Sequence, residues 1–363
     1  DPELSRGLGD VYKRQEHILV NEHKIMRTTE PVATQQSPPL LAGHTQTADP
    51  AEDNKIFDLL FDYETVQLVQ GAFSRKVQFA GTYRSALYLE EYGASSHNFG
   101  HLRGNRLGIC LPIFDKDAKW WGRSISEGHV PINHSGRTIH GTYNSGQRHV
   151  VMILDRTWCA EQLGDGFLGH SVEIDTIFNY KKSSFIEIAP RRVRRWAQRL
   201  CSLLTQVSPG CDEAQKAMFE KELLTAARSL LEPAEISQFD NSASKQLVEA
   251  ALLLADASQS TALSISTLCA NLKVSRRTLE LGFRTIIGKS PFQFFTDRRL
   301  CRAYIDLKQS DDESARVTDI ALSHGFTELG RFAHRYHKIF GELPSETLRQ
   351  RSGEFIRPII HPT

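Results

Sequence analysis

Apolar and polar residues alternate in two distinct ways along this 363-residue chain. Between about residues 57 and 188, short apolar stretches such as VQFAGTY (77–83) and VVMIL (150–154) are separated by clusters of Gly, Asn and Ser. Short apolar runs bounded by turn residues predict β-strands, and their close spacing predicts a small barrel or sandwich. We therefore expect a β-rich domain over residues 56–190.

The pattern changes to a helical one from residue 191 onward. Residues 191–207 place apolar side chains at helical spacing, and a second such helix follows the breaker SPG (208–210). Residues 191–240 are therefore predicted to form a helical linker. An apolar stripe does not identify its partner, so these helices would pack either on the β-rich domain or against a second copy of the chain in a homodimer.

Residues 243–350 are predicted to be helical throughout, and LCANLKVSRRTLELGFRTIIG (268–288) indicates two short helices around a tight turn. Leu279 and Phe283 would face the core of this unit. Cations at the positive N-terminal end of a helix are electrostatically disfavoured, so two arginines there favour a strongly negative partner in front of them. The residues expected to face that partner are Ser275, which is also an N-cap candidate, and Arg276, Arg277, Thr278 and Glu280.

A second unit repeats this layout in VTDIALSHGFTELGRFAHRYHKIFG (317–341), about 52 residues further on. Gly325 supplies the turn, and Leu329, Phe332 and Tyr336 are predicted to face inward. A single unit would fit a plain helical hairpin with a solvated basic end. Two units joined by one helix instead favour entry into successive major-groove segments of double-stranded DNA, about 34 Å apart. The outward residues of the second unit are Thr327, Glu328, Arg331, His334 and Arg335.

The segments SRRTLELGFRTIIGKSPFQFFTDRRLCRA and DIALSHGFTELGRFAHRYHKIFGELPSETLR closely resemble the AraC/XylS family of bacterial transcription regulators, over roughly residues 245–350. The resemblance implies an all-α double helix-turn-helix domain that binds DNA and acts on transcription initiation, which makes RNA polymerase an expected partner. One departure is Lys273, where the family often has Gly in the turn. A non-Gly residue held there in a left-handed conformation costs about 1 kcal/mol. The resemblance places two sets on the recognition helices: Arg276, Arg277 and Glu280 on the first, and Glu328, Arg331 and Arg335 on the second.

Regulators with this DNA-binding end commonly carry an N-terminal sensing domain, often a cupin-like barrel. QLVQGAFSRKVQFAG (67–81) and WWGRSISEGHVPI (120–132) resemble the ethanolamine-utilisation regulator group, whose domain answers to ethanolamine and a cobalamin cofactor. No ligand contact is carried over from that group, and we predict no cofactor and leave the small-molecule effector unidentified. The expected fold is thus α+β and multidomain, with a β-rich cupin-like barrel, a helical linker and the double helix-turn-helix domain.

Two other classes of function need side chains that the chain does not supply in the required pattern. A cupin-type metalloenzyme would hold its metal with His and carboxylate ligands, but the tight H-x-H spacing followed by a carboxylate is absent. A DNA-repair alkyl-transfer protein would need a reactive Cys, and no Cys cluster lies upstream of residue 243. We therefore predict no enzyme activity and no metal site. Five histidines are expected in surface or loop positions: His97, His101, His129, His134 and His140. Trp120 and Trp121 are expected in the core rather than in a ligand pocket.

Composition adds little to this picture. The formal net charge is +1, which says nothing about partners. The six cysteines have no C-x-x-C pair, which favours a reducing, cytoplasmic setting, and no apolar run approaches the roughly 20 residues that span a bilayer. Residues 1–55 read as a disordered lead-in, with 1–15 non-native in character, and residues 351–363 as a tail.

Overall fold

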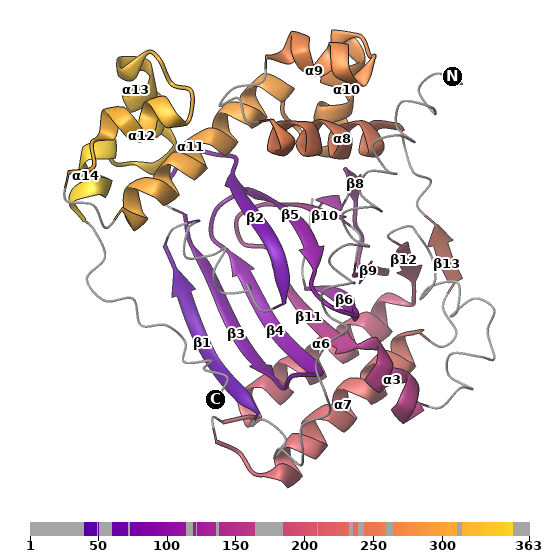
Figure 1. Ribbon diagram of the computed structural model, residues 1–363. Helices are drawn as coiled ribbons and strands as arrows, with labels where there is room; N and C mark the ends of the chain where they lie inside the picture. Colours follow the sequence, from indigo (N-terminus) through magenta and orange to yellow (C-terminus); the bar gives the residue numbers. More distant parts are fainter. Residues whose placement is uncertain are drawn as a thin grey trace, which may run out of the picture.

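The computed structural model of the chain describes residues 40–48, 50, 60–71, 73–113, 119–120, 122–135, 138–163, 184–208, 210–231, 235–238, 243–258, 264–310 and 314–350. A β-rich N-terminal part lies beneath a helical C-terminal part (Figure 1). Most of the predicted lead-in and all of the predicted tail lie outside the described residues. Within the predicted lead-in, however, Leu41–Thr47 forms strand β1, because its backbone pairs with β3 from Leu41 opposite Gly81 to Thr47 opposite Arg75.

Two antiparallel sheets make up the N-terminal part. The larger sheet has the strand order β1 (Leu41–Thr47), β3 (Arg75–Gly81), β4 (Ser85–Tyr92), β11 (Arg148–Asp155), β6 (Arg106–Ile113), β9 (His129–His134), β12 (Ser184–Glu187) and β13 (Glu235–Gln238). The smaller sheet has the order β2 (Phe61–Gln67), β5 (Ser96–Leu102), β10 (Thr138–Tyr143), β7 (Lys119–Trp120) and β8 (Arg123–Ser124). Every pair of neighbouring strands in these two lists is antiparallel.

The closed, cupin-like barrel that we expected is not formed by the described strands. β1 and β13 end the larger sheet, β2 and β8 end the smaller one, and no ladder joins the two sheets among the strands described. One buried cluster takes side chains from both sheets, including Phe61 and Ile139 of the smaller sheet and Tyr88 and Val151 of the larger. The two sheets therefore form an open sandwich, because each inner face buries its apolar side chains against the other.

The outer face of the larger sheet is covered by helices. α3 (Arg156–Leu163) follows β11, and α6 (Pro190–Gln206) and α7 (Glu213–Leu231) lie below the sheet in Figure 1. Val193, Leu200 and Phe219 of these helices share one buried cluster with Leu111 and Met152 of the sheet. The apolar stripe of the predicted linker is thus buried within the chain itself rather than left open for a second copy.

The C-terminal part contains α8 (Ala243–Ala257), α9 (Ile265–Leu272), α10 (Arg276–Ile286), α11 (Pro291–Gln309), α12 (Val317–Ser323), α13 (Leu329–Phe340) and α14 (Pro344–Arg349). These helices form two small bundles with separate cores, and α11 belongs to both. Its Phe294 and Cys301 lie in the core around α8, α9 and α10, whereas its Leu300 and Leu307 lie in the core around α12 and α13. In the part of the chain that the structure describes, no helix is both long and apolar enough to cross a membrane.

Candidate nucleic-acid interface

The first unit turns at Lys273 and begins its second helix at Ser275. Lys273 has a left-handed backbone with φ 53° and donates its N–H to the carbonyls of Ala270 and Cys269, which closes α9. It is the one non-glycine with positive φ among the described residues, and such a backbone costs free energy in a residue with a Cβ. The Ser275 hydroxyl accepts the Thr278 N–H at 3.0 Å and therefore caps α10 as predicted.

α10 presents a mixed-charge outer face. Its inner face buries Leu279 and Phe283, as the periodicity predicts, together with Ile286. Arg276 is 75% exposed, and its Nε lies 3.2 Å from Oε1 of Glu280, one turn further along the helix. The predicted set of Ser275, Arg276, Arg277 and Thr278 is exposed at the start of this helix, with Glu280 half-buried. Two cations and two hydroxyls are thus brought together at one helix end.

α13 repeats this arrangement after a turn at Gly325, which has φ 74°. Phe332 and Tyr336 are buried, but Leu329 is 39% exposed, because it lies at the helix start beyond the edge of the core. Arg331 is also 75% exposed, and its Nε lies 2.9 Å from Oε2 of Glu328. The other predicted residues of this unit, Thr327, His334 and Arg335, are exposed as well.

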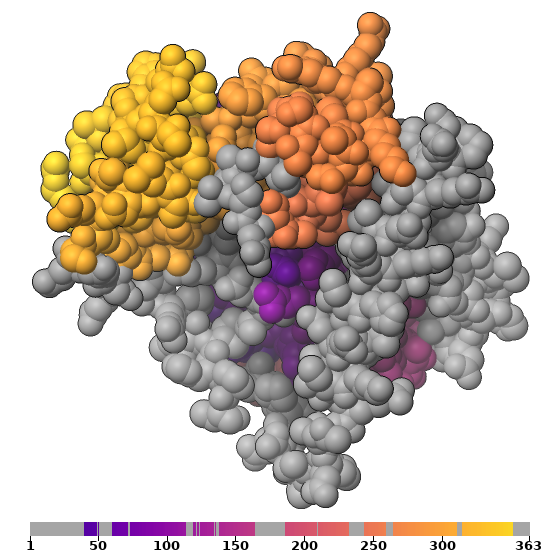
Figure 2. Space-filling view, turned by 45° about the horizontal axis from the view of Figure 1, so that its top comes forward, coloured from indigo at the N-terminus to yellow at the C-terminus, as the bar shows by residue number. Residues whose placement is uncertain are grey.

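Near the start of both α10 and α13, an exposed arginine is therefore paired with a glutamate that lies on the same helix or at its N-cap. Figure 2 shows the first unit in orange and the second in yellow, as two adjacent lobes at one end of the molecule. Exposed ion pairs of this kind contribute only about 0–1 kcal/mol, so the arginines remain available to a stronger anion such as a phosphate.

One exposed residue of this surface was missed by the sequence analysis. Leu281 on α10 is 63% exposed, two positions after the buried Leu279. The helical period places Leu281 away from the core face of Leu279 and Phe283, so the spacing itself predicts this exposure. An apolar side chain on a groove-reading helix can contact the methyl group of thymine.

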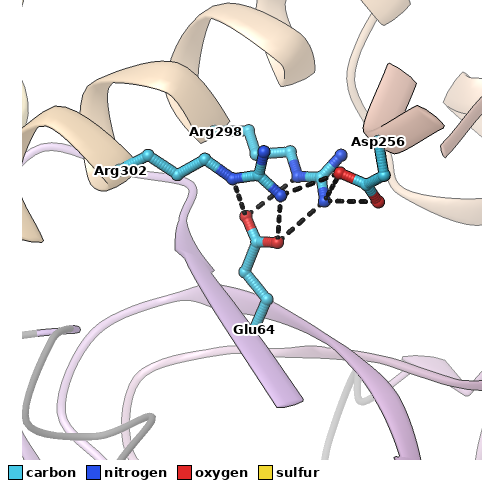
Figure 3. Close-up of polar contacts among 4 residues, drawn as sticks. All are labelled: Glu64, Asp256, Arg298 and Arg302. Carbon is cyan, nitrogen blue, oxygen red and sulfur yellow. Dashed lines mark hydrogen bonds and ion pairs between the residues drawn. The ribbon is translucent and has the colours of Figure 1, made fainter. Parts of the chain in front are cut away.

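Three arginines of α11 contact residues outside their own helix. Arg298, Arg299 and Arg302 have the helical spacing of a polar face that points away from the core of α11. Arg298 is in fact buried, and Arg298 and Arg302 both contact Glu64 of β2 (Figure 3). The guanidinium of Arg299 lies 5.0 Å from the centre of the Phe326 ring. Helical periodicity identifies a polar face but does not reveal that another domain covers it.

Two of the five histidines are also placed differently from the prediction. His97 of β5 and His140 of β10 are buried, with Nε2 and Nδ1 3.3 Å apart, and the His97 ring meets the edge of Phe294 on α11 at 5.7 Å. Burial lowers the pKa of His97 to about 3 and also lowers the pKa of His140, which keeps both neutral at pH 7. Among the described residues, no group of three or more His, Cys, Asp or Glu side chains could hold a metal ion.

A small cavity lies between the two sheets. Its volume is about 30 Å³, which holds roughly one or two waters. Trp120 packs in the core as predicted and also lines this cavity, whereas Trp121 lies outside the described residues. Two buried polar atoms of its lining, Nε1 of Trp120 and Oδ1 of Asn133, have no hydrogen-bond partner in the described part of the chain.

A buried ion pair joins Arg75 and Glu90 in the wall of this cavity. Burial raises the pKa of Glu90, but the charges of Arg75 and His149 outweigh that effect and lower it to about 2.

Comparison with known proteins agrees with the geometry of the C-terminal part. A helix-turn-helix domain model matches residues 268–350. The probable thc operon regulatory protein of Rhodococcus erythropolis is 39% identical over 87 residues, which are 24% of this chain and 26% of that protein. The XylDLEGF operon transcriptional activator of Pseudomonas putida is 38% identical over 88 residues, which are 24% of this chain and 27% of that protein. The chain thus spans about a quarter of the length of these curated relatives.

A solved structure is also similar to part of this chain. A probable AraC family transcriptional regulator from Rhodopseudomonas palustris is 36% identical, with a TM-score of 0.27, over 29% of this chain and 98% of that one. The family model lies outside the N-terminal half, so the resemblance of that half to the ethanolamine-utilisation group stays a prediction. Residues 268–350 of this chain therefore form a helix-turn-helix domain of the AraC/XylS type.

Proposed function

We propose that the chain is a sequence-specific DNA-binding regulator of transcription that reads two successive major-groove segments with α10 and α13. The observation that carries this proposal is the repeated exposed arginine at the start of each helix, Arg276 and Arg331, each on a unit with its own core. Because α11 belongs to both cores, the two helices are held on one body. Two groove segments on one face of DNA lie about 34 Å apart.

The proposed roles of the exposed residues follow from their chemistry. An arginine can donate two hydrogen bonds to one guanine, and hydroxyls or a histidine can donate to phosphates. Glutamates can accept from the amino group of cytosine, or hold the neighbouring arginine in place. The proposed DNA-contacting set is Ser275, Arg276, Arg277, Thr278, Glu280, Thr327, Glu328, Arg331, His334 and Arg335.

Two further parts of the proposal concern partners. RNA polymerase is the proposed protein partner, because the relatives that the C-terminal part matches are named as operon regulators or activators. The β sandwich is proposed to respond to a small-molecule effector, since it packs directly on α11, the helix that belongs to both units. Such coupling is reciprocal: an effector that tightens DNA binding is itself bound more tightly in the presence of DNA.

Alanine variants test the assignment of the recognition helices. Arg276→Ala and Arg331→Ala are each expected to weaken binding to a selected DNA site by about 1–3 kcal/mol and to relax preference at one base pair. Arg199→Ala is the matched control, because Arg199 is also exposed and paired with a glutamate, Glu222, but lies on α6. Unchanged affinity and unchanged sequence preference in both recognition-helix variants would overturn the proposal.

A further inference from the structure

Glu64 of β2 joins the smaller sheet to the helices of the DNA-binding domain. Arg298 donates to Glu64 from Nε at 2.9 Å and from Nη2 at 2.8 Å, and Arg302 donates to the same carboxylate at 3.2 and 2.8 Å. Asp256, near the end of α8, accepts from the same two arginines at 2.8–3.0 Å. Figure 3 shows these four residues, which we call the interdomain charge cluster, with Glu64 pointing up from its strand toward α11.

The cluster is balanced in charge and partly buried. Only 4% of the Arg298 side chain and 20% of the Glu64 side chain are exposed. The guanidinium of Arg298 also lies 4.9 Å from the centre of the Phe99 ring on β5. Burial by itself raises the pKa of Glu64, but the two arginines outweigh it and hold that pKa below its ordinary value. Within this cluster Glu64 is the partner from the other domain, whereas Asp256 and both arginines belong to the helical part.

Three more contacts reach the recognition helices themselves. The Gln67 side chain donates from Nε2 to the carbonyl of Ile339 at 3.1 Å, and the Gly71 N–H donates to the same oxygen at 3.2 Å. Ile339 is the penultimate residue of α13. On the other unit, Gly122 has φ 77°, and a Cβ there would clash with the carbonyl oxygen of Thr285 near the end of α10.

These contacts share a geometry that leaves the proposed DNA surface free. The sandwich meets α10 and α13 at their C-terminal ends, whereas Arg276 and Arg331 lie at the N-terminal ends. The three anchor points fall on the first unit, on α11 and on the second unit. A single rigid body that holds both units restrains their relative orientation more than α11 does alone.

We propose that the β sandwich is a positioning element that sets the relative orientation of the two recognition helices, with Glu64 as the residue that joins it to α11. The full chain then distinguishes DNA sites by the spacing between their two elements. This inference rests on the proposed reading of two groove segments. It assigns the positioning role to residues that lie outside the DNA surface.

The test measures affinity of the full-length chain for a series of DNA duplexes that differ in the spacing of the two selected elements, around the value of about 10 base pairs expected for one helical turn. Wild-type protein is expected to prefer one spacing by at least about fivefold, the lower range of typical couplings. Glu64→Gln is expected to bring that preference below about twofold, with a smaller change in affinity for the best site. Asp256→Asn removes a carboxylate from the same arginines without touching the sandwich, so it is expected to keep the preference.

Each outcome decides between the proposals. Suppose that the wild-type protein selects a two-part site and prefers one spacing. If that preference survives in Glu64→Gln, or falls equally in Asp256→Asn, the positioning role is overturned and the proposed function stands. A wild-type protein with no two-part site overturns the proposed function as well. Circular dichroism establishes that each variant folds. If Glu64→Gln does not fold, the same test is made with Gln67→Ala, which removes the side-chain contact to α13.

Discussion

Lowering the pH from 7 to 5 is expected to destabilise the chain through the histidines buried beneath α11. His97 is fully buried on β5, lies beside His140 and packs against Phe294 of α11. Burial lowers its pKa from the ordinary 6.5 to about 3. Its Nδ1 lies 2.9 Å from the Thr142 hydroxyl and its Nε2 3.3 Å from Nδ1 of His140, and burial disfavours the charged form of the ring.

The size of this effect follows from the difference in pKa between the folded and unfolded chains. Below pH 6.5 the unfolded chain binds a proton at His97 and the folded chain does not. The free energy of unfolding therefore loses nothing through His97 above pH 6.5 and declines as the pH falls toward 3. Each pH unit in that interval costs about 1.4 kcal/mol. Acidification to pH 5 therefore removes about 2 kcal/mol through His97, a large part of a typical total of about 5–15 kcal/mol.

Urea unfolding at pH 7 and pH 5 measures this loss. His97→Asn is expected to be less stable than wild type at pH 7, but to lose about 2 kcal/mol less on acidification, because its site no longer takes up a proton on unfolding. His101→Asn, on the same strand but with its side chain about half exposed, is the control and is expected to lose as much as wild type. Equal losses in wild type and His97→Asn would refute the buried neutral histidine.

Three further substitutions probe the two DNA-binding units. Glu328→Gln is expected to weaken binding to the selected site about two- to fivefold, since it removes the carboxylate that accepts from a base or holds Arg331 in place, and titration at low salt measures it. Lys273→Gly is expected to raise the free energy of unfolding by about 1 kcal/mol in urea denaturation, because glycine adopts the left-handed turn without strain. Leu281→Ser is expected to abolish a preference for thymine over uracil at one position, worth about 1 kcal/mol in wild type for a lost methyl contact.

Each of these substitutions has an outcome that counts against its reasoning. Tighter DNA binding by Glu328→Gln would mean that the carboxylate neither contacts a base nor holds Arg331 in a productive position. A less stable Lys273→Gly protein would mean that glycine loosens the unfolded chain by more than the turn gains. A Leu281→Ser protein that keeps the thymine preference would place that side chain away from the bases.

The features that the sequence predicted well are those encoded by a few neighbouring residues. The cap at Ser275 and the turn at Gly325 both depend on local hydrogen bonds and allowed backbone angles. The buried positions Leu279 and Phe283 follow from helical period alone. For this reason the amino-acid sequence by itself predicts the repeated layout of the two units.

The features that were predicted wrongly depend on which distant segments meet. Arg298 has the sequence signature of a solvated residue, and only the position of Glu64, 234 residues earlier, makes it an interior ion pair. His97 and His140 become neighbours only because β5 and β10 pair. Strand pattern likewise could not decide between a closed barrel and an open sandwich, since both alternate apolar and polar residues in the same way.

The most direct test of the central claim is selection of bound sequences from a random DNA pool with the full chain, followed by footprinting of the best site. Two recurring elements about 10 base pairs apart, protected on one face of the duplex, with affinity that falls steeply with salt, are the predicted result. A single short element, or binding with no sequence preference at any salt concentration, would contradict the reading of two groove segments by α10 and α13.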